Sequence, residues 1–356
     1  MSPQTNPSQV CFRGLGQLGA KTIYAAGKQP ERRFSFSSAL LKSDEKVLAN
    51  LEFLADNGYI PKDATVFVLG SPDQVRRILG SNANVFDQKE FDPKAVGADV
   101  FVDFTFDASE FIHNIRHAGL ASPIIVQSNN YRSGRLWVPP LEEPEARGQT
   151  PGVFRAADCS LGGAIPALAH VKQYFESLFL HFVTDRNVGK SPDSPFDNAF
   201  FFSDSFPRRK SIEFQALTGV DTLVTIASSA CINPFYIGMV SGIVDEAAIL
   251  RQFGSWTRFE KVGFALLLEG VPNVHISRED STSNHRLPPE PSTVEAFARA
   301  YPSLDDPYIV YFTRTLIRRG TLVSFKLGFD VNLTATMSNL HLLEALTDPT
   351  LSTSAP

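Results

Sequence analysis

The chain has 356 residues, of which 43% are hydrophobic and 20% are charged, and its formal net charge at pH 7 is -5. This composition predicts a folded, soluble protein with core enough for two domains, and it excludes a disordered chain and a basic nucleic-acid-binding surface. Three cysteines, Cys11, Cys159 and Cys231, are an odd number at wide spacing, which excludes a disulfide framework and a cysteine-rich metal site. The start, Met1–Gln9, has no apolar h-region of a signal peptide. We therefore expect a cytoplasmic protein without a resident metal and without a nucleic-acid or membrane partner.

The first predicted element is a strand that ends in a glycine-rich turn. Residues 10–13 form a short apolar strand, and Ala20–Ala26 continues as a helix. Between them, glycines with the spacing Gly-x-Gly-x-x-Gly permit a tight turn, close approach of a pyrophosphate and close packing of the helix on the sheet. This order predicts the first βαβ unit of a Rossmann domain. The residues expected to contact a dinucleotide there are Gly14, Gly16, Gln17, Leu18 and Gly19.

The next strand bears on the choice between NAD and NADP. An acidic residue about 20 positions after the glycines binds the free 2′-hydroxyl of NAD. The sequence that follows has Arg32 and Arg33, then Ser37 and Ser38, and no carboxylate among them. Hydroxyls and arginines suit a 2′-phosphate, so we expect NADP rather than NAD, with Ser37 and Ser38 at the ribose.

Helix and strand patterns then alternate up to residue 127. Helices are expected at 44–57, 71–79 and 108–118, and strands at 64–70, 98–105 and 123–127. This alternation predicts a largely parallel, doubly wound α/β sheet. The segment Asn129–Gly152 is rich in Pro, Glu, Arg and Gly and reads as a linker.

A cysteine follows this linker at the predicted start of a helix. Asp158, Cys159 and Ser160 precede an apolar pattern of helical spacing that extends to about Phe179. Peptide N–H groups and the helix dipole stabilise an anion at a helix N-terminus, so a thiol there ionises more readily than a free one. Cys159 is therefore a candidate nucleophile, and a small buried residue is the alternative.

His181 interrupts the apolar strand that follows, Ser177–Arg186. A helix and a strand after Cys159 are enough chain to return this imidazole to the thiol, as a Cys/His pair requires. A satisfied core histidine is the alternative. The irregular segment Asn187–Lys210 then ends in a basic run that includes Arg208.

The second half of the chain is dominated by β-type runs. Strands are expected at 222–227, 262–269, 274–277, 308–314 and 322–328, which predicts a mainly antiparallel sheet. The uncharged run Thr222–Val244 contains an Asn-Pro pair, glycines and hydroxyl residues, so we interpret it as buried sheet and turn rather than a membrane span. A final helix, Leu333–Leu346, has an apolar face.

The predicted fold is thus an N-terminal Rossmann domain followed by an α+β domain with a mainly antiparallel sheet. The expected boundaries are 1–157 for the dinucleotide-binding domain, completed by the helix at 333–350, and 158–332 for the catalytic domain.

The order of these features resembles the glyceraldehyde-3-phosphate dehydrogenase family and its relatives among phosphorylating aldehyde dehydrogenases. Ala157-Asp158-Cys159-Ser160 is similar to the family's Ala-Ser-Cys-Thr, and His181 with Thr184 to its His-Ala-Tyr-Thr. Leu217-Thr218-Gly219 is similar to a phosphate-binding Ser-Thr-Gly turn. The resemblance implies Cys159 as nucleophile and His181 as base. It also implies cofactor contacts at Thr105 and Asn332, and substrate or phosphate contacts at Ser160, Thr184, Thr218 and Gly219.

Three positions differ from the family pattern. Asp158 replaces a serine, Gly162 an asparagine, and Gly242 an arginine that binds phosphate. Arg186, Arg208 or Arg209 could supply a replacement cation, since arginine binds phosphate bidentately.

The resemblance implies an NADP-preferring aldehyde dehydrogenase. The Cys159 thiolate adds to the aldehyde, hydride passes to the nicotinamide, and phosphate or another acceptor releases the resulting thioester. An amino-acid semialdehyde dehydrogenase and a non-catalytic Rossmann-like binding or scaffold protein are the alternatives. The expected partners are an aldehyde or acyl phosphate and further copies of the chain, as a homodimer or homotetramer.

Overall fold

The computed structural model describes residues 7–29, 34–128, 133–138, 152–185, 201–202, 205–229, 235–278 and 291–347. The chain divides into two compact units. The first unit comprises Met1–Asp158, Pro291–Leu304 and Ala335–Pro356, and the second comprises Cys159–Glu290 and Asp305–Thr334. The main division falls one residue after the boundary expected from the sequence. Residues 291–304, which the sequence assigned to the second domain, lie in the first unit.

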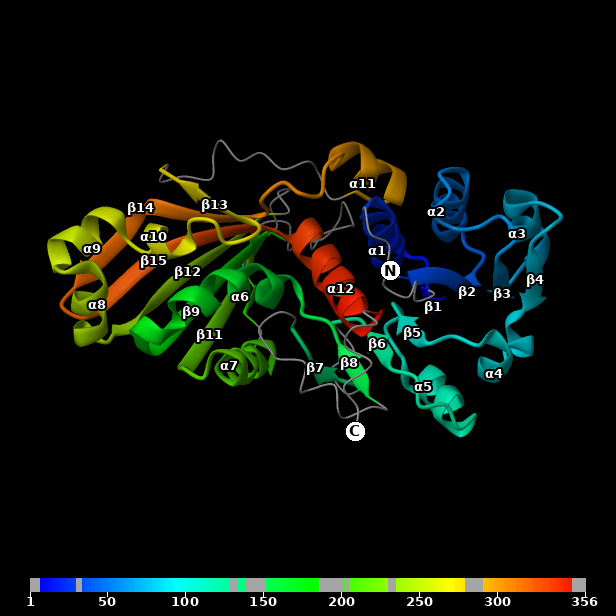
Figure 1. Cartoon of the computed structure of the whole chain (residues 1–356), viewed down its shortest axis with the longest axis horizontal. Coiled ribbons are helices and arrows are strands. Elements are labelled where there is room, and N and C mark those ends of the chain that lie inside the picture. The colour runs from blue at the N-terminus through cyan, green and yellow to red at the C-terminus, as the bar shows by residue number, and fades with distance from the viewer. Residues whose placement is uncertain are drawn as a thin grey trace, which may run out of the picture. The chain divides into compact units, whose positions relative to one another are not determined.

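The first unit is built on an eight-stranded sheet in which every strand pair is parallel (Figure 1). Its order is β4-β3-β2-β1-β5-β6-β8-β7. The strands are β1 (Ser8–Arg13), β2 (Phe34–Lys42), β3 (Thr65–Leu69), β4 (Asn84–Asp87), β5 (Val100–Asp103), β6 (Ile124–Val126), β7 (Arg135–Leu136) and β8 (Val153–Arg155). The chain moves outward from β1 to β4 and then returns to the other side of β1 at β5, which makes the β1/β5 junction the switch point of a doubly wound sheet. The predicted Rossmann-like class is confirmed.

Helices connect these strands. They are α1 (Gln17–Lys28), α2 (Glu45–Asp56), α3 (Pro72–Leu79), η1 (Gln88–Glu90), α4 (Pro93–Val96) and α5 (Ser109–His117). A further helix of this unit, α11 (Val294–Ala300), comes from the segment Pro291–Leu304. The helix α12 (Val331–Thr347) begins in the second unit and continues into the first. Each βα alternation predicted up to residue 127 is present, because apolar strand residues and helical spacing are strong local signals.

Aromatic and aliphatic side chains fill the core of the first unit. One cluster joins Cys11 and Phe101 of the central strands to Phe111 and Ile115 of α5. Cys11 is fully buried there, and this burial raises the pKa of its thiol to about 12. Cys11 therefore stays protonated at neutral pH and acts as a small apolar residue.

The segment around α11 contributes to the first unit through specific contacts. The ring of Phe297 packs edge-on against Tyr24 of α1, with centroids 6.0 Å apart. The backbone N–H of Val294 donates to Oδ1 of Asn50 over 2.9 Å, while the Asn50 amide donates to the carbonyl of Leu15. Asn50 thus links the start of α11 to the loop that contains the glycine motif.

The second unit is built on a seven-stranded mixed sheet of order β10-β11-β9-β12-β15-β14-β13. The strands are β9 (Phe175–Asp185), β10 (Phe201–Phe202), β11 (Asp221–Ser229), β12 (Phe235–Val244), β13 (Val274–Ser277), β14 (Ile309–Arg319) and β15 (Leu322–Asp330). The helices are α6 (Cys159–Val171), η3 (Lys172–Tyr174), α7 (Ser205–Thr218), α8 (Glu246–Phe253), α9 (Trp256–Val262) and α10 (Ala265–Leu268). Antiparallel pairs predominate, as predicted, but β11 runs parallel to β9 and β13 parallel to β14.

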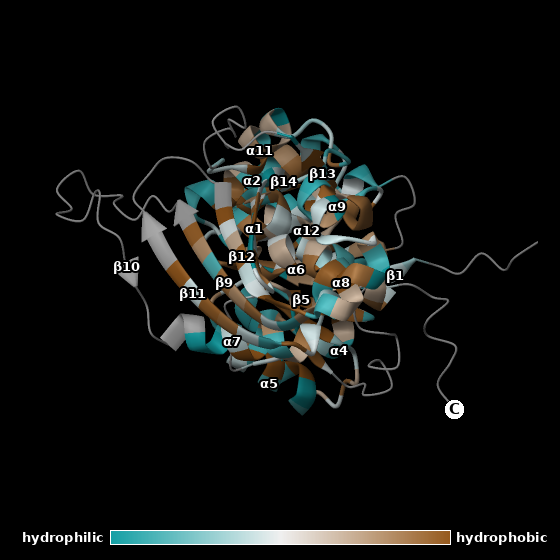
Figure 2. Ribbon diagram, turned by 90° about the vertical axis from the view of Figure 1, so that its left-hand side faces the viewer, coloured by the Kyte–Doolittle hydropathy of each residue, from teal (hydrophilic) through white to brown (hydrophobic). Residues whose placement is uncertain are grey.

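The two faces of this sheet differ. Phe182 of β9 packs against Phe214 of α7, and Phe329 of β15 lies against Gly163 of α6, so helices cover this inner face. On the outer face Phe179, Leu223 and Met239 expose 39%, 57% and 40% of their surface. Figure 2 shows the apolar bands of β9 and β11, which lie side by side.

One predicted strand is wrong and one apolar run is explained. Residues 262–269 are the end of α9 and the short helix α10, because an apolar run of this length fits a buried helix as well as a strand. Within the run 222–244, residues 222–229 belong to β11 and residues 235–244 form β12, and the residues between them lie outside the described part of the chain. Among the helices of the described residues, none combines the length and apolar character that a membrane span needs.

Candidate functional site

The glycine turn after β1 has the geometry that the motif predicts. Gly14 has φ +90° and donates its N–H to the carbonyl of Leu40 over 2.9 Å. A Cβ at Gly19 would lie 2.2 Å from the Gly14 carbonyl oxygen, so only glycine fits there. A Cβ at Gly16 would meet no atom within 4 Å. Gly14 and Gly19 are thus required by the fold itself, whereas Gly16 leaves space above the turn.

The start of α1 faces this space. Gly16 is the N-cap of α1, and no side chain caps the helix. Gln17 and Leu18 are the first two helical residues, whose N–H groups have no partner within the helix. The Gln17 side chain donates instead to the carbonyl of Pro291. An uncapped helix start beside a glycine turn is a suitable site for a phosphate group.

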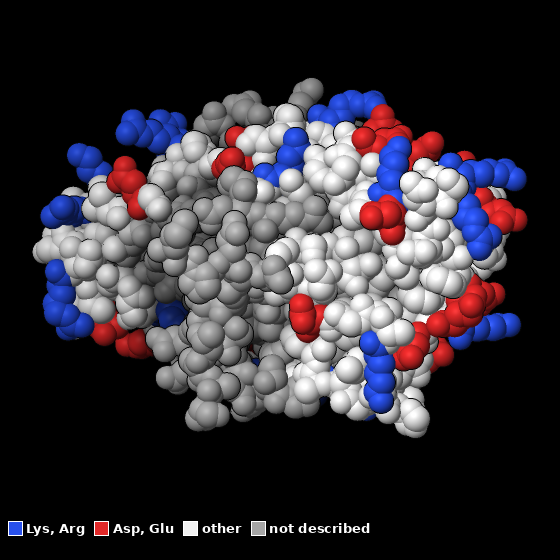
Figure 3. Space-filling view, turned by 45° about the vertical axis from the view of Figure 1, so that its right-hand side comes forward, with Lys and Arg blue, Asp and Glu red and all other residues white. Residues whose placement is uncertain are grey.

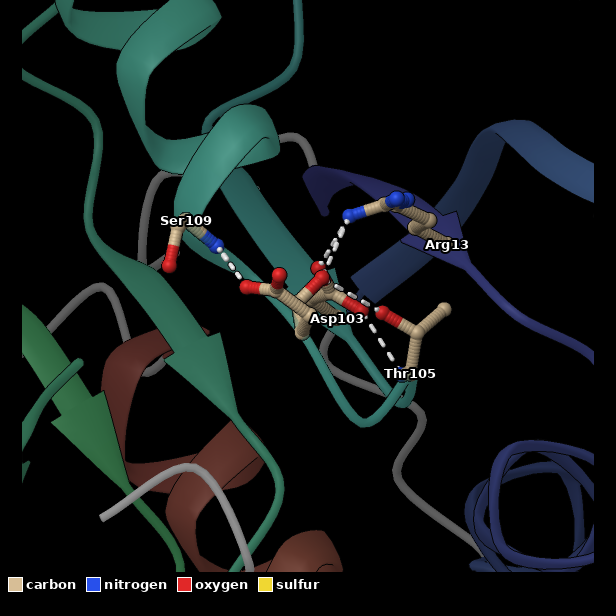
Figure 4. Close-up of polar contacts among 5 residues, drawn as sticks. Arg13, Asp103, Thr105 and Ser109 are labelled. Atoms are coloured by element: carbon tan, nitrogen blue, oxygen red, sulfur yellow. Dashed lines mark hydrogen bonds and ion pairs between the residues drawn. The ribbon is translucent and has the colours of Figure 1, made fainter. Parts of the chain in front are cut away.

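An ion pair supports the turn from the neighbouring strand (Figure 4). Arg13 donates to Oδ2 of Asp103 over 2.8 Å and to the carbonyl of Asp107 over 3.1 Å. Asp103 is fully buried and its Oδ1 accepts the N–H of Thr105 over 2.7 Å. Burial raises the pKa of Asp103, although Thr105 and Arg13 oppose the shift. The network holds Thr105 against Gly14, where the Thr105 methyl group would lie 3.2 Å from an added Cβ.

A cavity of about 350 Å³ opens beside this network at the carboxyl ends of β1, β2 and β3. Leu40, Leu69, Phe91 and Phe111 supply apolar walls, and Arg13, Lys89 and Glu110 supply charged groups. The guanidinium of Arg13 lies 5.4 Å from the Phe111 ring centroid, so both side chains are fixed relative to each other. Ligands of doubly wound sheets bind at this edge, outside the carboxyl ends of the strands.

The predicted ribose contacts are misplaced because β2 extends further than expected. Ser37 and Ser38 lie in the middle of β2, which ends at Lys42. The Ser37 hydroxyl donates to the carbonyl of Val96, and Ser38 is buried. Arg32 and Arg33 lie outside the described residues. The last residue of β2 is Lys42, which nothing in the sequence singled out.

Cys159 is the first residue of α6, as predicted. Cys159 is half-buried, whereas Ser160 and Asp158 are buried, with 3% and 6% of their surface exposed. Both Cys11 and Cys159 are thiols rather than halves of a disulfide. The geometry of a thiol at a helix start is therefore present.

The structure does not bring His181 to this thiol. Strand residues alternate between faces, and the neighbours of His181, Leu180 and Phe182, are buried on the inner face. His181 points to the outer face, where its Nδ1 shares a hydrogen bond of 2.7 Å with Oγ1 of Thr225. Helix α6 packs on the inner face through Gly163. The predicted catalytic pair is thus separated by the sheet.

The predicted phosphate contacts Thr218 and Gly219 are also not in a position suited to an anion. Thr218 ends α7, where its hydroxyl donates to the carbonyl of Phe214 over 2.7 Å, and Gly219 follows with φ +71°. A helix C-terminus presents carbonyl groups, which repel an anion. Asp221, three residues after Thr218, pairs with Ser177 near the start of β9, whereas Cys159 begins α6, whose 13 residues span about 18 Å before that strand.

The remaining predicted contacts are dispersed. Arg208 is an exposed residue of α7, while Arg186 and the side chain of Thr184 lie outside what the structure describes. Asn332 is buried in the first turn of α12, and its N–H donates to Oδ1 of Asp330 over 2.7 Å. Asp330 thus caps the start of α12.

A second buried ion pair, in α7, was not predicted from the sequence. Lys210 of α7 is completely buried and bonds to Glu213 one turn later. The signal is a lysine and a glutamate three residues apart, which on most helices marks an exposed face. Among the described residues, no group of three or more His, Cys, Asp or Glu side chains is arranged to hold a metal ion.

Comparison of the chain with protein-family models and with curated proteins finds no match. On the face shown in Figure 3, basic and acidic side chains are interspersed.

Proposed function

We propose that this protein binds a nicotinamide dinucleotide at the glycine turn of its first unit. The observation that supports the proposal is that the three glycines differ in the space around them. The turn requires glycine at Gly14, which has a positive φ, and at Gly19, where a Cβ would clash with the backbone. A Cβ at Gly16 would meet only open space next to the uncapped start of α1. That is the space a pyrophosphate needs for close approach to the backbone.

The test is the binding of NADPH and NADH to the whole protein, followed by calorimetry or by nicotinamide fluorescence. We expect Gly16→Ala to keep the thermal unfolding midpoint of the wild type, because its methyl group meets open space. The same variant should bind the dinucleotide at least roughly tenfold more weakly, since the methyl group occupies the position of the phosphates. Equal binding by the variant and the wild type, or no binding by the wild type, would refute the proposal.

An NADP-dependent aldehyde dehydrogenase is the second candidate, and Cys159 favours it. The thiol lies at the start of α6 and is half-buried, so ionisation and attack on an aldehyde are chemically reasonable there. In that reaction the Cys159 thiol would lose its proton to solvent and its sulfur would form a C–S bond to the aldehyde carbon. A bound NADP would supply the hydride acceptor, and attack by an acceptor such as phosphate would break the C–S bond and free the thiol. His181 does not serve as the base in this version, because it faces the other side of the sheet.

Aldehyde-dependent formation of NADPH distinguishes the candidates. A dehydrogenase should show activity with a panel of simple aldehydes and amino-acid semialdehydes, and Cys159→Ala should abolish it. If the protein is a binding or scaffold protein, the wild type and Cys159→Ala should bind the dinucleotide with the same affinity, and neither should show turnover.

A further inference from the structure

The cavity of the first unit and the end of β2 share one side of the sheet. Leu40 of β2 and Leu69 of β3 line the cavity. Lys42 lies two residues beyond Leu40 and pairs in register with Leu69. Because alternate strand residues point to the same face, the side chain of Lys42 emerges on the side of the cavity. Lys42 is exposed and lies at the end of β2, next in the sheet to the cavity-lining residues Leu40 and Leu69.

The position of this lysine is the one that discriminates between dinucleotides in doubly wound sheets. A carboxylate at the end of the second strand accepts a hydrogen bond from the 2′-hydroxyl, and a cation accommodates a 2′-phosphate. The nearest carboxylate along the chain, Asp44, is engaged elsewhere, since its Oδ1 accepts the N–H of Val47 and caps α2. The end of β2 therefore presents a cation rather than an acid.

The other charges around the cavity do not duplicate this role. Arg13 is paired with Asp103 over 2.8 Å, and among the described residues of the cavity walls the other charged side chains are Lys89 and Glu110. Within the described part of the chain, Lys42 has no ion-pair partner. Its charge is thus available to a ligand.

We propose that this cavity takes the adenosine end of a 2′-phosphorylated dinucleotide and that Lys42 is the residue that selects the 2′-phosphate. The proposal rests on the dinucleotide binding proposed above. The purine lies against the apolar walls formed by Leu40, Leu69 and Phe111, as ligand cavities commonly arrange apolar contact with a few polar groups. The ribose lies at the end of β2, and the phosphate bonds to the Lys42 ammonium.

The test compares four ligands, NADPH, NADH, 2′,5′-ADP and 5′-AMP, binding to the wild type and to Lys42→Ala by calorimetry. A hydrogen bond to a charged group is lost in the variant, so NADPH and 2′,5′-ADP should bind roughly ten- to a hundredfold more weakly. NADH and 5′-AMP should change by less than about twofold, because neither carries the 2′-phosphate. Lys42→Asp should reverse the preference toward NADH.

Lys62→Ala is the matched control. It removes the same charge from an exposed lysine that precedes β3, at the amino ends of the strands and therefore at the opposite edge of the sheet. All four affinities should stay at the wild-type values, which separates a local contact from a general effect of net charge.

The outcomes separate this assignment from the proposed function. If the wild type binds NADPH and NADH equally, or if Lys42→Ala weakens both alike, Lys42 does not select the phosphate although dinucleotide binding stands. If the wild type binds neither dinucleotide, both proposals fail together.

Discussion

Nη1 of Arg13 lies 2.8 Å from Oδ2 of Asp103, and the two residues are register partners at the ends of the adjacent parallel strands β1 and β5. The carboxylate is fully buried, whereas 18% of the Arg13 side chain remains exposed. The guanidinium therefore compensates a charge that water cannot reach.

Replacing Arg13 makes the stability of the protein more dependent on pH. Burial raises the folded-state pKa of Asp103 above its ordinary value, so its contribution to stability is complete below about pH 4 and is lost as pH rises through the folded pKa. Arg13→Met should raise that pKa further. We expect the variant to lose about 2 kcal/mol of unfolding free energy at pH 7 and less at pH 4, as measured by urea denaturation.

Arg76→Met is the comparison for this experiment. Arg76 pairs with Asp73 on the surface, with 50% and 78% of the two side chains exposed. Exposed pairs contribute little, so its unfolding free energy should change by less than about 1 kcal/mol at either pH. A loss for Arg13→Met that is equal at pH 4 and pH 7 would show that the titration of Asp103 is not involved.

Gly19→Ala should disrupt the glycine turn itself. The added methyl group would lie 2.2 Å from the Gly14 carbonyl oxygen and 2.9 Å from the Phe104 ring, and the backbone oxygen cannot move without changing the turn. We expect a loss of about 2 kcal/mol or more in unfolding free energy. Thermal denaturation next to Gly16→Ala provides the contrast, because both variants add one methyl group to the same motif. Equal midpoints for the two variants would contradict the packing argument.

The reactivity of Cys159 should be independent of His181. His181 faces the outer side of the sheet and bonds to Thr225 over 2.7 Å. We therefore expect His181→Ala to leave the rate of Cys159 alkylation by iodoacetamide unchanged within about twofold. Mass spectrometry identifies the alkylated residue, and Cys11, whose pKa is raised to about 12, serves as the unreactive internal reference. A large fall in the Cys159 rate would mean that the imidazole acts on the thiol after all.

Gly163→Ala tests the packing of α6 on the inner face. A Cβ at this position would lie 2.2 to 2.7 Å from ring carbons of Phe329. Since Phe329 is fully buried, the ring has little room to yield, and we expect a loss of about 1 to 3 kcal/mol in unfolding free energy. The double variant Gly163→Ala/Phe329→Leu removes the clash, so it should be more stable than Gly163→Ala. A double variant that is less stable would locate the effect elsewhere.

Features that depend on neighbouring residues were predicted well from the sequence. Features that depend on contacts between distant parts of the chain were not. Gly14, Gly16 and Gly19 were identified because the motif and its flanking strand and helix occupy one short stretch of chain. The end of β2 was missed because the alternation of serines with apolar residues in Phe34–Lys42 gives no sign of where the strand stops.

The predicted pairing of Cys159 with His181 failed for a different reason. Whether a strand residue faces one side of a sheet or the other depends on a single step of the alternation. The sequence shows that His181 lies in β9, but the face follows from the pairing of β9 with β11 and β12, which unites residues far apart in the chain. The buried Lys210 and Glu213 were missed similarly, since their burial follows from tertiary packing of α7.

The route of the chain has a consequence for biosynthesis. The first unit takes its first 158 residues from the beginning of the polypeptide but completes itself with α11 and with α12, whose Thr347 carbonyl accepts the hydroxyl of Ser8. A nascent chain that has emerged only to Asp158 lacks Phe297, the partner of Tyr24. The Rossmann-like unit therefore reaches its finished state only after the chain has been synthesised as far as α12, and a fragment that ends at Asp158 should be prone to degradation.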